Sequence, residues 1–81
     1  MQITEKQLGI LSHNRGIVKA SVDDDIKDMG KMNLNFTNLS KEQAKDLIET
    51  IYKLEEAYSD EKDADYAKYK IQIINTLSNL I

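Results

Sequence analysis

The clearest pattern of apolar and polar positions runs from Leu39 to Tyr58. Ser40 and Gln43 have the spacing of a capping box, in which each side chain accepts a hydrogen bond from the backbone N–H of the other residue. Apolar residues then recur at helical spacing on one face, and charged residues fill the opposite face. The apolar stripe comprises Ala44, Leu47, Ile48, Ile51, Leu54 and Tyr58. The pattern predicts a helix over about residues 40–58, with its stripe in the core and its charged face in water.

A second helical pattern covers about residues 61–79, and it carries two apolar stripes. One stripe comprises Ala64, Ala67, Ile71, Ile74 and Ile81, and the other comprises Tyr66, Tyr69, Ile73, Leu77 and Leu80. A surface helix normally has one apolar face, and a single small core does not easily cover two. We therefore expect the second stripe to contact another protein. The alternative is that two strands cover one stripe and the preceding helix covers the other.

The stretch between these two helical patterns is polar, which favours a break and a helical hairpin. Ser59 or Asp60 would cap the second helix. No Gly or Pro forces the break, so one long bent helix over residues 40–79 is the alternative.

Residues 4–12 fit two kinds of structure. Thr4 and Gln7 have capping-box spacing, which favours a short helix ending in a left-handed cap at Asn14 and Gly16. The alternative is a strand through Leu8 and Ile10.

Two short segments alternate between apolar and polar residues. In residues 17–22 the second half alternates, and in residues 32–37 the apolar positions are Met32, Leu34 and Phe36. A period of two predicts half-buried strands, and an antiparallel hairpin would need to pack on the helix at 40–58 to be stable. The predicted fold class is therefore α+β, in one small domain covering residues 1–81.

The composition limits how this fold can be stabilised and where the protein is expected to act. The chain has 81 residues and no Cys, so it has no disulfides and buries only a modest core. It shows neither a signal peptide nor an apolar run of membrane-spanning length, which leads us to expect a cytoplasmic protein without membrane contact. Its small size, its lack of Cys and its many Asn, Lys and Ile residues resemble those of small helical proteins carried by phages and mobile elements, although no diagnostic motif is present.

The net charge of −3 is unevenly distributed. Residues 23–28 carry a net −3 and residues 53–65 a net −4, which leaves +4 for the rest of the chain. Two acidic clusters disfavour a protein that binds nucleic acid through phosphate contacts, because such a protein would need a basic stripe.

The sequence contains no complete catalytic or metal-binding motif. His13 is the only His, and it has no partner that the sequence identifies for general-base work. Asp23 and Asp25 match only two positions of a calcium-binding loop, and the glycines are too scattered for a phosphate-binding loop. We expect no enzyme activity, no cofactor and no metal.

The leading hypothesis is a protein-interaction module, self-associating and most simply a dimer, that acts as an accessory or inhibitor of a larger protein, such as one that processes nucleic acid. The apolar stripe of the last helix would bind the partner, and acidic residues would steer the approach of a basic surface. The candidate contact residues are Tyr66, Tyr69, Ile73, Leu77, Leu80, Asp23, Asp24, Asp25, Asp28, Glu55 and Glu56.

Two alternatives remain open. A small nucleic-acid-binding protein would use Arg15, Lys19 and Lys31, with Lys41 as a further cation. A small-ligand site at a subunit interface would be lined by His13, Asn14 and Arg15.

Overall fold

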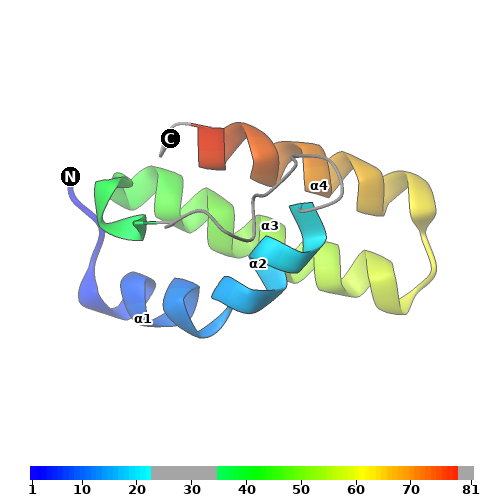
Figure 1. The fold of residues 1–81 in the computed structure, drawn as a ribbon, viewed down its shortest axis with the longest axis horizontal. Helices are drawn as coiled ribbons and strands as arrows, with labels where there is room; N and C mark the ends of the chain where they lie inside the picture. The colour runs from blue at the N-terminus through cyan, green and yellow to red at the C-terminus, as the bar shows by residue number, and fades with distance from the viewer. Residues whose placement is uncertain (23–34, 79–81) are drawn as a thin grey trace.

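The computed structural model describes residues 1–22 and 35–78, which form four α-helices and a 3₁₀ turn. The elements are α1 (Glu5–His13), α2 (Arg15–Val22), η2 (Phe36–Asn38), α3 (Lys41–Ser59) and α4 (Asp63–Ser78). Helices α3 and α4 form an antiparallel hairpin, with α1 and α2 on one side of it (Figure 1). Helix α1 packs mainly against α3, and α2 packs against α4.

The N-termini of α1 and α3 both carry the predicted capping boxes. The Gln43 N–H donates to the Ser40 hydroxyl (3.1 Å), and the Ser40 N–H donates to the Gln43 side chain (2.9 Å). Thr4 and Gln7 form the same pair of bonds, which confirms a helix rather than a strand in this segment. The Gln7 amide also donates to the Lys41 carbonyl oxygen (3.1 Å), so the two helix starts are joined.

Only Asn14 separates α1 from α2. Its φ is −97°, so the predicted left-handed cap is wrong, and its side-chain amide donates to the Ile10 carbonyl oxygen (2.8 Å). The predicted strand at 17–22 is also wrong, because these residues belong to α2. Val18 lies seven residues after Leu11, and both are fully buried. Positions 18 and 22 are four apart, so an alternation this short fits a helix as well as a strand.

The second predicted strand, at 32–37, is contradicted where the structure describes it. Residues 32–34 lie outside the described part, and Phe36 begins the 3₁₀ turn η2. The Asn35 side chain accepts a hydrogen bond from the Thr37 N–H (3.2 Å), which is a local bond that favours a turn over a strand. The predicted α+β class is therefore wrong, since the described residues contain helices and one isolated bridge between Gln2 and Ser40.

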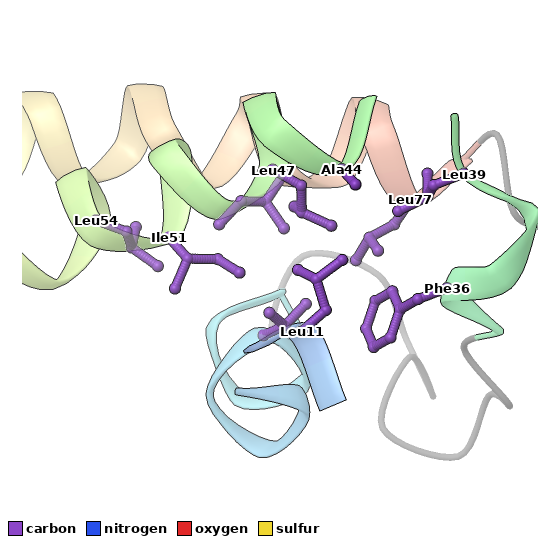
Figure 2. Close-up of a cluster of buried hydrophobic side chains, with 10 residues drawn as sticks. Leu11, Phe36, Leu39, Ala44, Leu47, Ile51, Leu54 and Leu77 are labelled. Carbon is purple, nitrogen blue, oxygen red and sulfur yellow. The ribbon is translucent and has the colours of Figure 1, made fainter. Parts of the chain in front are cut away.

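The core lies between the α3–α4 hairpin and the shorter elements (Figure 2). Leu11 of α1 points toward α3, and Phe36 of η2 lies beside it (Figure 2). One cluster of buried side chains draws on all five elements and on Leu39, which connects η2 to α3. Its members are Leu11, Val18, Phe36, Leu39, Ala44, Leu47, Ile51, Leu54, Ile73 and Leu77. Burial of each large aliphatic side chain contributes roughly 1.5–3 kcal/mol to folding.

A tight turn confirms the helical hairpin over one bent helix. Glu61 has a φ of 57°, the left-handed conformation usually taken by Gly. The Lys62 N–H donates to the Ala57 carbonyl oxygen (2.9 Å), and the Glu61 N–H donates to that of Tyr58 (3.3 Å). These two bonds form a Schellman motif. The predicted cap at Ser59 or Asp60 is wrong, because α4 begins only at Asp63.

The hairpin is longer than the helices that cover it. At ~1.5 Å per residue, α3 and α4 extend roughly 28 and 24 Å, whereas α1 and α2 extend only about 13 and 12 Å. The turn between α3 and α4 projects beyond the end of α2 (Figure 1). This projection leaves one end of the hairpin without a covering helix among the described residues.

Candidate functional site

An open groove of about 470 Å³ lies where α2 meets the projecting end of the hairpin. Its lining comprises Ile17 and Ala20 of α2, Leu54, Glu55, Tyr58 and Ser59 of α3, and Tyr66 of α4. Leu54 belongs to the core, whereas Ile17 is 45% exposed and Tyr58 74% exposed. The groove is therefore an opening from solvent toward the apolar core.

Two tyrosines from opposite sides of the turn form one wall of this groove. The ring centroids of Tyr58 and Tyr66 are 6.0 Å apart, and their planes are tilted by 49°. The Schellman motif reverses the chain so that the last turn of α3 faces the first turns of α4. The Lys70 ammonium lies 5.6 Å from the Tyr66 ring centroid, within the range of a cation–π contact. Tyr66 thus has contacts within the fold, while most of the Tyr58 ring remains available to solvent.

Exposed carboxylates surround this end of the molecule. Glu55 lines the groove, and Glu61 and Asp63 line an adjoining depression that shares Tyr58 and Tyr66 with it. A separate and smaller depression of about 230 Å³ is lined by Ala57, Tyr69 and side chains of both charges, namely Lys53, Glu56, Asp60, Lys62 and Asp65. The α3 residues that line the groove belong to the segment at 53–65, which carries a net charge of −4.

The predicted docking stripe on α4 mostly faces inward. Ile73 and Leu77 are fully buried, and Tyr66 and Tyr69 pack partly buried against the core. Ile73 and Leu77 therefore cannot form a docking surface on the folded chain, because α3 and the neighbouring elements already cover them. The other stripe faces outward at Ile71, which is 58% exposed.

Tyr58 was predicted to belong to the core stripe of α3, and that assignment is wrong. Ala57 is buried there instead, whereas Tyr58 is 74% exposed. Ile17 and Ala20 were missed as groove residues, since residues 17–22 were expected to form a strand packed on the helix at 40–58, whereas they form the helix α2.

The alternative candidate residues lie at the junction of α1 and α2. His13 and Lys19 retain solvent contact, whereas Asn14 caps α1. The Arg15 guanidinium lies 5.3 Å from the Phe36 ring centroid and thereby connects α2 to η2. Asn14 and Arg15 thus have roles in the fold that account for their positions.

Several predicted contact residues lie outside the described part of the structure. They are Asp23, Asp24, Asp25, Asp28, Lys31 and Leu80. Within residues 1–22 and 35–78, no three Asp, Glu or His side chains gather closely enough to hold a metal ion. In the same ranges, no helix has the length and hydropathy needed to cross a membrane.

Comparisons of the chain with protein-family models, with curated proteins and with solved structures found no match.

Proposed function

We propose that this protein is a protein-interaction module that binds a segment of a partner protein in the groove between α2, α3 and α4. One observation carries the proposal: an open apolar groove whose wall includes the exposed ring of Tyr58 and the exposed side chain of Ile17. Aromatic residues beside apolar depressions are the usual anchors of protein interfaces. The mainly apolar lining favours binding over catalysis as the role of this site.

The proposal is tested by comparing two exposed tyrosines on the same helix. Tyr58 lines the groove, whereas Tyr52 is 54% exposed and is not one of its lining residues. Wild type, Tyr58→Ala and Tyr52→Ala proteins are each used to capture partners from the native host, followed by mass spectrometry. We expect Tyr58→Ala to lose partners that Tyr52→Ala retains. Identical partner sets for all three proteins would contradict the role of the groove.

Self-association is a second candidate, favoured by the outward-facing Ile71. Ala64 and Ala67 are also exposed on α4, so a second helix could approach this face closely. Sedimentation at micromolar concentration is expected to detect a dimer that Ile71→Asp converts to monomer. A wild-type monomer under these conditions would remove this candidate.

A further inference from the structure

We infer that the groove accepts a basic amphipathic helix from another protein. This inference rests on the proposed function and specifies the chemistry of the partner. The apolar residues of that helix would enter the groove, and its Lys or Arg residues would face the surrounding carboxylates. Binding of a helix in a groove requires anchors at i, i+3 or i+4, and i+7.

The groove exposes apolar core surface to an incoming side chain. Leu54, which is only 2% exposed, contributes core surface to the groove, and α2 and the tyrosine pair border it. On the α2 side the small side chain of Ala20 permits close approach of another backbone. The groove is open rather than enclosed by protein, which suits a segment whose backbone stays outside while its side chains enter.

The charge around the groove selects basic partners. Glu55 borders the apolar lining directly, and Glu61 and Asp63 extend the negative surface toward the turn. Complementary charge accelerates association and disfavours acidic competitors. The exposed Tyr58 ring offers a further site for a cation.

The same charge argues against a second copy of this chain as the occupant. A symmetric dimer places the same surface of each copy against the other. Such a dimer through the groove would bring together two surfaces that each carry Glu55, Glu61 and Asp63. Like charges across an interface oppose binding, so the occupant is expected to be a different protein.

A random library of displayed 16-residue peptides provides the probe. The library is selected on the wild-type protein and depleted on Tyr58→Ala, and synthetic versions of the enriched peptides are measured by fluorescence anisotropy. We expect enriched peptides to combine apolar residues at helical spacing with Lys or Arg. Tyr58→Ala should weaken their binding by about thirtyfold, as for a central aromatic anchor.

Neutralising the groove carboxylates measures the contribution of charge to peptide affinity separately from that of shape. The triple variant Glu55→Gln, Glu61→Gln, Asp63→Asn should weaken binding by about tenfold, and added salt should reduce this difference. The matched control is the triple variant Glu42→Gln, Asp46→Asn, Glu49→Gln. It makes the same change in charge, at exposed side chains on the half of α3 away from the turn. The control should change affinity by less than about twofold.

The outcomes distinguish the two proposals. Enriched peptides that bind through Tyr58 but are neutral or acidic would overturn the basic partner while leaving the groove as a binding site. Equal effects of the two triple variants would also overturn it. A library that yields no Tyr58-dependent peptide would contradict both the basic partner and the groove. A wild-type dimer that Tyr58→Ala dissociates would identify a second copy as the occupant.

Discussion

Two isoleucines on α4 provide a direct comparison of its two faces. Ile73 is fully buried, whereas Ile71, two positions earlier on the same helix, is 58% exposed. Ile73→Ala removes three carbon groups from the core, a transfer loss of roughly 2.4 kcal/mol at ~0.8 kcal/mol per group. The cavity adds to this loss, and buried Ile→Ala substitutions cost about 2–5 kcal/mol in total.

Ile71→Ala should have a far smaller effect. Its side chain is already more than half exposed, and Ala has a higher helix propensity than Ile, which offsets part of the remaining loss. We expect a change within about 0.5 kcal/mol, as for most surface substitutions. A chain of 81 residues has a total stability of roughly 4–12 kcal/mol, so only the Ile73 variant approaches unfolding.

Urea and thermal unfolding followed by far-ultraviolet circular dichroism measure both variants. For a domain of this size, a loss of about 3 kcal/mol lowers Tm by roughly 12–24 °C. Equal destabilisation by the two substitutions, or a larger loss for Ile71→Ala, would refute the assigned orientation of α4.

Three further substitutions test local features of the fold by the same unfolding assay. Gly9→Ala should stabilise the protein by about 0.5–1 kcal/mol, because Gly9 is exposed within α1 and an added Cβ would meet nothing within 4 Å; a loss of stability would show that the site is not open helix. Glu61→Gly should also stabilise by about 0.5–1 kcal/mol, since Gly adopts the left-handed φ of 57° without a steric cost; a clear loss would argue against the Schellman turn. Ser40→Ala should cost about 1 kcal/mol by removing the acceptor for the Gln43 N–H, and no change in the urea midpoint would contradict the capping box.

Local sequence signals predicted the two helices whose N-termini carry capping boxes. The capping boxes at Thr4 and Ser40 involve residues only three positions apart, so they can be identified without tertiary information. The stripe of α3 was long enough to distinguish a helical period from an alternating one. Residues 17–22 were too few for that distinction, and Asn35 supplied a turn where alternation indicated a strand.

The groove could not be predicted from local patterns. It exists because the α3–α4 hairpin extends past α2, and this depends on how elements of different length are placed. For the same reason Tyr58 continued the apolar stripe in sequence but lies beyond the covering helices. The sequence of α4 contains two apolar stripes, but their spacing does not determine which of them faces the core.

Photo-crosslinking from the groove in the native host tests the central claim most directly. A photoreactive phenylalanine, such as p-benzoyl-phenylalanine, replaces Tyr58 in one variant and Tyr52 in a matched control. We expect a distinct protein adduct from position 58, with the crosslinked partner peptide rich in Lys or Arg beside apolar residues, and no such adduct from position 52. The same adducts from both positions, or none from position 58, would contradict the groove as the binding site.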